Sequence, residues 1–284
     1  MRAFAGLLGA LFLAVPCAAD QMDVSYGPDS RQRLDVLGEA PGRKSPAVLL
    51  IHGGGFIEGD RGGFAVLAPS FVAHGIVVIS VDYRLADGAA ENRWPAQLED
   101  AQLAVRWARA HANELGIDPQ HICALGGSAG AQLSLLLGVL LAIEPGDMAD
   151  RLAEISPRVD CVIAVSAPTD FVSWGPHPYI DQKLFGHPTL PQLLSASPAL
   201  RLNSAPPPIL LVHGTADRLT PLAQGQEMRD ALARRGFPVS FVTHGGAHSF
   251  AGLKPKDRLT VLSLAARFVL SPLDSPQTLD LDAQ

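Results

Sequence analysis

The sequence predicts a three-layer α/β sandwich around a mostly parallel central sheet, formed by one domain over residues 20–270. Short runs rich in Val, Ile and Leu alternate along the chain with longer segments of helical periodicity. The short runs are apolar at every position, as in strands that are buried on both faces of a parallel sheet. A helix near the middle of the chain is apolar on all sides, which places it between two other layers.

Six short apolar runs are expected to form the core of the sheet. They cover residues 47–51, 76–81, 122–125, 159–165, 209–212 and 239–242. Two earlier segments, residues 23–26 and 33–37, are expected to add an antiparallel edge, as in many sheets of mixed direction.

Three helices are expected from their apolar patterns. The first covers residues 95–115, ends at Gly116 in a left-handed conformation, and has one apolar stripe: Leu98, Ala101, Val105 and Ala108. The last helix stops before Pro272 and repeats such a stripe: Leu259, Leu262, Ala266 and Val269. The helix directly after Ser128 is apolar on every face: Leu133, Leu135, Leu136, Leu137, Val139, Leu140 and Leu141.

The alternation of strands and helices is interrupted in two places. Residues 168–208 are rich in Pro, Ser and His and lack clear periodicity, so we interpret them as a small loop-and-helix excursion that shapes a substrate pocket. Residues 271–284 form a polar C-terminal tail, expected to be loose.

The composition is that of a globular, soluble protein. The chain has 284 residues, of which 48% are hydrophobic and 18% charged, and its formal net charge is −6. Because no run of Lys or Arg is present to neutralise a series of phosphates, no nucleic-acid partner is expected. The composition does not predict the oligomeric state.

The first 19 residues resemble a secretory signal peptide. Arg2 precedes an apolar run over residues 4–15, and the small residues Cys17 and Ala19 favour cleavage after Ala19. The run is shorter than the roughly 20 residues that a membrane-spanning helix needs, so no stable membrane insertion is expected. We therefore expect a secreted or periplasmic protein. A lipid anchor on Cys17 and a buried N-terminal helix are the alternatives.

Two further cysteines, Cys123 and Cys161, each lie in an apolar run that is expected to be an interior strand. The favoured interpretation is two buried thiols, because buried strand side chains rarely have disulfide geometry. An oxidising compartment would permit a disulfide between them. Neither cysteine belongs to a Cys/His cluster with ligand spacing, so no metal site is expected.

The segment 126–130 reads Gly-Gly-Ser-Ala-Gly and matches the pattern G-x-S-x-G around Ser128. It directly follows the expected strand 122–125 and directly opens the apolar helix. A sharp turn from strand to helix needs small neighbours and exposes the serine hydroxyl at the positive end of the helix. The pattern therefore predicts Ser128 as a nucleophile; an ordinary glycine-rich turn is the alternative.

A second glycine-rich segment, residues 52–56, reads His-Gly-Gly-Gly-Phe and follows the expected strand 47–51. Its backbone amides can approach a ligand and hold an oxyanion, and each such donor lowers a barrier by about 3–4 kcal/mol. The expected oxyanion-hole donors are the amides of Gly54, Gly55 and Ala129. A phosphate-binding loop is the rival, but neither G-K-[ST] nor G-x-G-x-x-G follows. His52 is expected to orient this loop rather than to catalyse.

A nucleophilic serine needs a base and an acid that orients the base. His248 lies after the last expected core strand and ahead of the last helix, on the same sheet edge as Ser128. Asp217 follows the strand 209–212. We predict His248 as base and Asp217 as acid, with His244 and Asp170 as the respective competitors. The order Ser, Asp, His is that of α/β-hydrolases.

The motifs HGGGF, GGSAG, HGTAD and GAHSF, together with residues 82–85, resemble the α/β-hydrolase carboxylesterases of the hormone-sensitive-lipase-like and feruloyl-esterase-like branch. The resemblance covers about residues 24–269 and implies the α/β-hydrolase fold and a serine esterase that needs no cofactor. We expect no long N-terminal helical cap of the kind found in many lipase-like relatives, and therefore a more open pocket. Residues 130–132 read Gly-Ala-Gln where relatives often have Gly-Gly-His. Residues 64–84 also resemble arylformamidases, which usually carry an aromatic residue where Gly55 stands.

The leading functional hypothesis is hydrolysis of carboxylic esters, with short acyl chains, on a small-molecule or polymer-linked substrate. The alternatives are an arylformamidase-like amidase, an acetylxylan or feruloyl-type esterase, and a binding protein that keeps the fold without catalysis. Sequence does not distinguish esters from activated amides, and it does not give the acyl length or the alcohol.

Overall fold

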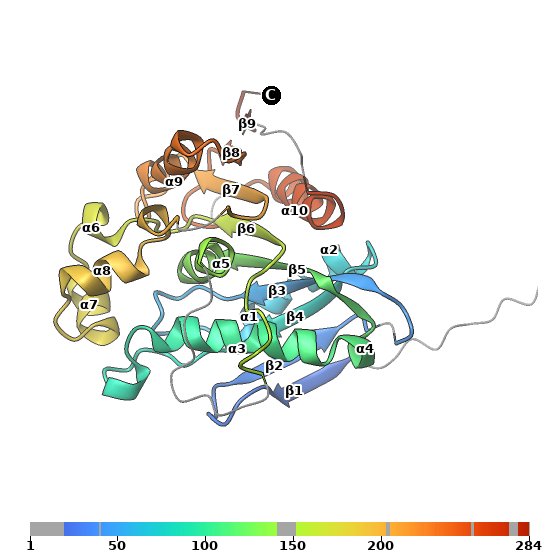
Figure 1. The fold of residues 1–284 in the computed structure, drawn as a ribbon. Coiled ribbons are helices and arrows are strands. Elements are labelled where there is room, and N and C mark those ends of the chain that lie inside the picture. The colour runs from blue at the N-terminus through green and yellow to red at the C-terminus, as the bar shows by residue number, and fades with distance from the viewer. Residues whose placement is uncertain are drawn as a thin grey trace, which may run out of the picture.

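The structure is a computed structural model that describes residues 20–39, 41–140, 152–202, 205–250, 253–272 and 278–283. In these ranges nine strands form one sheet in the order β1-β2-β4-β3-β5-β6-β7-β8-β9 (Figure 1). Their bounds are Gln21–Ser25 (β1), Arg33–Leu37 (β2), Ser45–Ile51 (β3), Val77–Val81 (β4), Ile117–Gly127 (β5), Cys161–Val165 (β6), Ile209–Gly214 (β7), Ser240–His244 (β8) and Thr278–Asp280 (β9). β1 and β2 pair antiparallel, β2 also pairs antiparallel with β4, and every other pairing is parallel. The predicted mostly parallel sheet with an antiparallel edge is confirmed.

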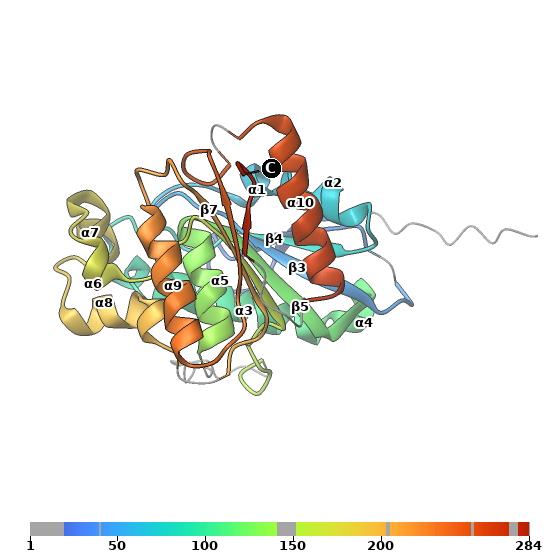
Figure 2. The same ribbon diagram turned by 90° about the horizontal axis from the view of Figure 1, so that it is seen from above.

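Helices cover both faces of the sheet. Their bounds are Arg61–Ala65 (α1), Ala68–Val72 (α2), Ala96–Ala110 (α3), Ala112–Leu115 (α4), Ala129–Val139 (α5), Phe171–Trp174 (α6), Pro178–Leu184 (α7), Leu190–Ala196 (α8), Leu222–Arg234 (α9) and Pro255–Leu270 (α10), with 3-10 turns at Ala90–Asn92 (η1) and Pro198–Leu200 (η2). Seen from above, α3, α5 and α9 lie on one side of the sheet, and α2 and α10 lie on the other (Figure 2). The three-layer architecture is thus confirmed.

The core divides into two parts because successive residues of a strand face opposite sides of a sheet. In β3, Leu49 and Ile51 pack into the core under α3 and α5, whereas Val48 and Leu50 pack into the core under α2 and α10. Every described residue of α5 is buried, as expected for a helix that is apolar all round. Leu141, which was assigned to this helix, lies outside the described residues.

Three details of the elements differ from the prediction. The helix expected over 95–115 is two helices that meet at His111, whose backbone φ of −98° and ψ of 13° leave the helical region; the left-handed end at Gly116 is confirmed with φ 69°. Leu259 is 66% exposed, so the apolar stripe of α10 begins only at Leu262. The tail expected to be loose contains β9, which pairs with β8.

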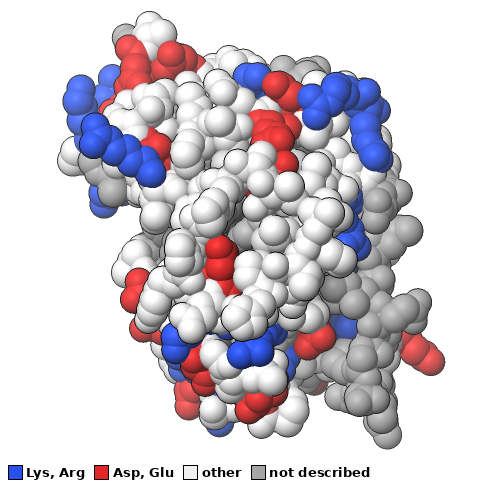
Figure 3. Space-filling model, turned by 90° about the vertical axis from the view of Figure 1, so that its left-hand side faces the viewer, with Lys and Arg blue, Asp and Glu red and all other residues white. Residues whose placement is uncertain are grey.

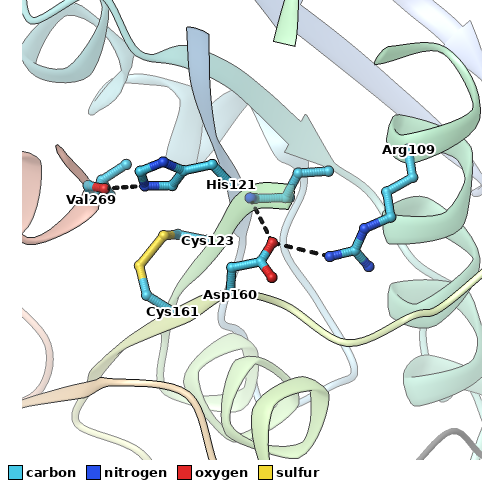
Figure 4. Close-up of a disulfide and its surroundings, with 7 residues drawn as sticks. Arg109, His121, Cys123, Asp160, Cys161 and Val269 are labelled. Atoms are coloured by element: carbon cyan, nitrogen blue, oxygen red, sulfur yellow. Dashed lines mark hydrogen bonds and ion pairs between the residues drawn. A yellow bond between two sulfur atoms is a disulfide. The ribbon is translucent and has the colours of Figure 1, made fainter. Parts of the chain in front are cut away.

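The favoured interpretation of Cys123 and Cys161 as free thiols is wrong, because the structure joins them in a disulfide (Figure 4). The two residues are direct register partners on the adjacent strands β5 and β6. Their Cα atoms are 4.5 Å apart, within the range that a disulfide spans. The sequence could not show this pairing, since it does not say which buried strands are neighbours.

The excursion between β6 and β7 folds into α6, α7, α8 and η2, on the left-hand side of Figure 1 beyond the carboxyl ends of the parallel strands. Among the described residues no helix combines the length and the apolar character needed to cross a membrane. The segment assigned to a signal peptide, residues 1–19, lies outside the described residues.

Candidate active site

Ser128 occupies the turn between the end of β5 at Gly127 and the start of α5 at Ala129. Its backbone has φ 54° and ψ −119°, a conformation that costs about 1–3 kcal/mol for a non-glycine residue and recurs at functional sites. A Cβ atom at Gly126 would lie 2.1 Å from the carbonyl oxygen of Gly130. One at Gly130 would lie 2.1 Å from the carbonyl oxygen of Ile51. The steric argument for glycine on both sides of Ser128 therefore holds in the structure.

The glycine-rich loop after β3 lies directly against Ser128. A Cβ atom at Gly53 would lie 3.2 Å from the Cβ of Ser128. Gly54 and Gly55 have φ values of 101° and 59°, in the left-handed region that favours glycine. Over the described part of the chain, the amides of Gly54, Gly55 and Ala129 donate no hydrogen bond to another residue.

His52 contacts the loop that it opens. Its Nδ1 donates to the carbonyl oxygen of Gly53 at 2.7 Å. The imidazole is stacked on Tyr83 with ring centroids 4.2 Å apart, and the Tyr83 hydroxyl donates to the His52 carbonyl oxygen at 3.0 Å. Burial lowers the pKa of His52 below its ordinary value, which favours the neutral ring. These contacts fix the course of the glycine-rich loop.

His248 and Asp217 are brought together from the loops after β8 and β7. Nδ1 of His248 donates to Oδ2 of Asp217 at 2.9 Å. The Asp217 carboxylate is fully buried, and its Oδ1 accepts from the amides of Leu219 at 3.0 Å and Thr220 at 2.9 Å. The side chain of His248 remains 22% exposed. Asp217 is thus held by its own loop, and His248 keeps its other ring nitrogen, Nε2, for a further partner.

The structure places the two competing residues elsewhere. Asp170 caps the N-terminus of α6, where its Oδ1 accepts from the amides of Val172 and Ser173. His244 is buried at the end of β8, and its Nδ1 accepts from the amide of Gly246 at 3.1 Å. Neither side chain lines the cavity that contains Ser128.

His213 was missed by the sequence reasoning. Its Nε2 donates to the carbonyl oxygen of Thr220 at 2.8 Å and lies 3.7 Å from Oδ2 of Asp217. Burial lowers the pKa of His213, and this favours a neutral ring beside the carboxylate. Its position at the end of a core strand, four residues before Asp217, is the signal that could have pointed to it.

A cavity of about 830 Å³ contains Ser128, His248 and the glycine-rich loop in its wall. The sequence reasoning also missed several wall residues: Phe64 from α1, Tyr179 and Ile180 from α7, Leu219 beside Asp217, and Glu58 and Asp60 ahead of α1. The face onto which the carboxyl ends of the strands open is hollowed, with acidic side chains (red) in and around the hollow (Figure 3). Within the described ranges, no group of three or more His, Cys, Asp or Glu side chains is arranged to hold a metal ion.

The sheet order and the serine between β5 and the buried α5 define an α/β-hydrolase, and the solved structures similar to the chain have this fold. Residues 34–232 match the sequence profile of the BD-FAE family, and the chain belongs to this family. The resemblance to α/β-hydrolase carboxylesterases stated from the motifs is thereby confirmed.

Curated and solved relatives give the same family context. The chain is 32% identical to Esterase LipC of Mycobacterium tuberculosis over 224 residues, which are 74% of this chain and 54% of LipC. It is 27% identical to the apo form of Thermogutta terrifontis esterase 2, with a TM-score of 0.75 over 91% of this chain and 97% of the other. An acetyl ester-xyloside bifunctional hydrolase from Caldicellulosiruptor lactoaceticus shares the fold at 23% identity, with a TM-score of 0.74 over 84% and 87% of the two chains. The chain spans about half the length of the curated relatives it matches.

Proposed function

We propose that the protein is a serine esterase that hydrolyses carboxylic esters with short acyl chains through an acyl-enzyme on Ser128. The observation that carries the proposal is the 2.9 Å hydrogen bond from His248 to the buried carboxylate of Asp217, together with the position of His248 and Ser128 in the wall of one cavity. A buried acid that orients an imidazole beside a serine is the arrangement that activates a hydroxyl for acyl transfer.

In the proposed reaction, Nε2 of His248 takes the proton of the Ser128 hydroxyl as its oxygen attacks the ester carbonyl. The imidazolium then gives this proton to the leaving alcohol. A water molecule, activated by the same imidazole, attacks the acyl-enzyme, and collapse of the second tetrahedral intermediate releases the carboxylic acid and free Ser128. Asp217 keeps the imidazole in the required tautomer and stabilises its charged form.

The amides of Gly54, Gly55 and Ala129 would hold the oxyanion of each tetrahedral intermediate. They have no acceptor among the described residues, so no internal bond has to break before they bind. Each such donor contributes about 3–4 kcal/mol to lowering the barrier. The positive end of the α5 dipole adds to their effect.

The names of the relatives support ester hydrolysis, since LipC and the Thermogutta protein are both called esterases. We further propose that the protein acts outside the cytoplasm. Two features support this: the segment 1–19 has the pattern of a signal peptide, and disulfides such as the one between Cys123 and Cys161 form and persist in oxidising compartments.

The test uses serine and carboxylate variants with 4-nitrophenyl acetate and butyrate. Ser128→Ala should lower kcat by a factor on the order of 10⁴ or more, because the nucleophile is lost. Asp217→Asn should lower kcat by roughly 10³–10⁴-fold, since the imidazole loses its orienting acceptor. Asp170→Asn is the matched control; it keeps the α6 cap and should stay within about threefold of the wild type. More than a few per cent of wild-type turnover in Ser128→Ala would refute the proposal.

A substrate panel separates the remaining alternatives. Esters from acetyl to decanoyl, acetylated xylan, methyl ferulate and an N-formyl aromatic amine would be compared at equal concentration. We expect kcat/KM to be highest for the acetyl and butyryl esters. A preference for the N-formyl amine would assign the chain to amide cleavage instead.

A further inference from the structure

Strained backbone gathers at the carboxyl edge of the sheet. Among the described residues, five non-glycine residues have a positive φ, and four of them lie at this edge: Phe56, Ser128, Ser166 and Ser249. Such a conformation costs on the order of 1–3 kcal/mol and persists where surrounding contacts fix it, which is common at functional sites. Phe56 belongs to the glycine-rich loop, Ser128 is the proposed nucleophile, and Ser249 follows the proposed base. Ser166 takes no part in the reaction steps proposed for Ser128, His248 and Asp217.

Ser166 directly follows β6, the strand between β5 and β7. Its amide donates to the carbonyl oxygen of Val212 at 2.8 Å, which ties it to the end of β7. The preceding residue, Val165, accepts from the amide of Ser128 at 2.9 Å. The backbone around Ser166 is therefore joined both to the nucleophile turn and to the strand that leads to Asp217.

The hydroxyl of Ser166 makes the contact that matters for His248. Its Oγ accepts from the amide of Ser249 at 2.9 Å, and the side chain is completely buried. Ser249 is the residue after His248. On the other side of His248, the carbonyl oxygen of Gly246 accepts from the amide of Ala216 at 3.2 Å. The loop that carries the imidazole is thus held on both sides, and Ser166 provides the contact on the C-terminal side.

We propose that Ser166 is a positioning residue for the ester hydrolysis proposed above, on which this inference rests. By holding the amide of Ser249, its hydroxyl sets the direction of the His248 imidazole, so that Nδ1 meets Asp217 and Nε2 is left for the proton of the Ser128 hydroxyl. Ser166 itself does not line the cavity, and it acts only through the backbone.

The test compares Ser166→Ala and Ser166→Gly with Ser197→Ala. Ser197 is an equally buried serine whose Oγ accepts from a backbone amide, that of Phe171 at 2.8 Å, away from the His248 loop. Ser166→Ala should lower kcat by about 10- to 100-fold, as expected when a catalytic group is displaced by a fraction of an ångström to 1 Å. KM should stay within about twofold, because the substituted side chain does not itself line the cavity. The rate at which a fluorophosphonate labels Ser128 should fall by the same factor as kcat.

Ser166→Gly should show the same loss, although glycine relieves the strain at φ 53°, and it gives the measurement if the alanine variant does not fold. Ser197→Ala should keep kcat within about twofold. Its resistance to urea unfolding should fall about as much as that of Ser166→Ala. The inference is overturned if the Ser166 variants keep more than half of the wild-type kcat, or if they lose no more than Ser197→Ala. Because Ser128→Ala is measured beside them, an active Ser128→Ala would show instead that the proposed function itself is wrong.

Discussion

At the scale of single residues, two buried imidazoles near the Asp217 loop favour their neutral form. His213 is the penultimate residue of β7 and His244 the last residue of the adjacent strand β8, and burial lowers the pKa of both. Nδ1 of His244 accepts a hydrogen bond from an amide, which a protonated ring could not do at that atom. Protonation of either ring would therefore destabilise the folded structure around the loops that carry Asp217 and His248.

We expect the free energy of unfolding to fall as the pH is lowered below about 6.5, the ordinary value for histidine. The folded-state pKa is depressed, so the unfolded chain binds the proton first, and stability rises with pH through this window. Urea unfolding between pH 7.5 and 5.5 would measure the decline. His244→Asn keeps an acceptor for Gly246 and should reduce the decline, whereas the exposed His187→Asn should not. An unchanged pH dependence in His244→Asn would contradict this assignment.

At the scale of elements, the disulfide joins β5 and β6, the strands that lead to Ser128 and Ser166. It lies in the core under α2 and α10. Next to it, Oδ2 of Asp160 accepts from Arg109 and from the amide of Ile122, and Nε2 of His121 donates to the carbonyl oxygen of Val269 (Figure 4). The start of β6 is therefore joined to the middle of β5 by a disulfide and a hydrogen bond, and to α3 by an ion pair.

The double variant Cys123→Ala/Cys161→Ala should lose about 4 kcal/mol of unfolding free energy, the loop-closure entropy of a bridge with a sequence separation of 38 residues. Equilibrium denaturation in urea would measure it. Wild-type protein that is unfolded in the presence of a reductant should have the same free energy of unfolding as the double variant. Folded samples of both should keep the same kcat, because the bridge is separated from the cavity. Equal denaturation midpoints without reductant would show that the bond makes no contribution.

The strands and the tight turn at Ser128 could be predicted because they depend on local patterns. Continuous apolar runs predicted the core strands, although β5 begins at Ile117, five residues before the predicted run 122–125, and glycine spacing predicted the tight turn at Ser128. What failed depends on partners that are distant in sequence: the bridge from Cys123 to Cys161, the pairing of β9 with β8, and the wall residues of the excursion such as Tyr179. The prediction that Leu259 belongs to the buried stripe of the last helix failed for a related reason. An apolar stripe does not show where the neighbouring layer ends.

At the scale of the whole molecule, the cavity has an uneven charge. Glu58 and Asp60 stand in its wall, and no Lys or Arg does among the described residues. On the face drawn in Figure 3, acidic side chains lie in the central hollow, and most basic side chains lie above and below it. A unit charge about 6 Å from a carboxylate gains roughly 1 kcal/mol at an effective dielectric constant near 50, which is a several-fold effect on a rate.

We therefore expect kcat/KM to decrease from a cationic to a neutral to an anionic ester of similar shape. Acetylcholine, 3,3-dimethylbutyl acetate and 3-acetoxypropanoate form such a series, with steps of about three- to tenfold. Glu58→Gln should reduce the differences in kcat/KM between the three esters, and so should high salt. Glu114→Gln, an exposed change on α4 at the other end of the sheet, should not. Equal rates across the series would show that the wall charge is screened.

The pairing of β9 with β8 also limits self-association of the protein. Without it, β8 would present a bare row of amides and carbonyl groups to solvent, and such a margin readily accepts a strand from another molecule. The amide of Leu281 adds one more bond to the carbonyl oxygen of Thr243. An exoprotease that removed the C-terminal residues back to Thr278 would therefore expose the edge of β8. The trimmed molecules would be prone to self-association along this edge.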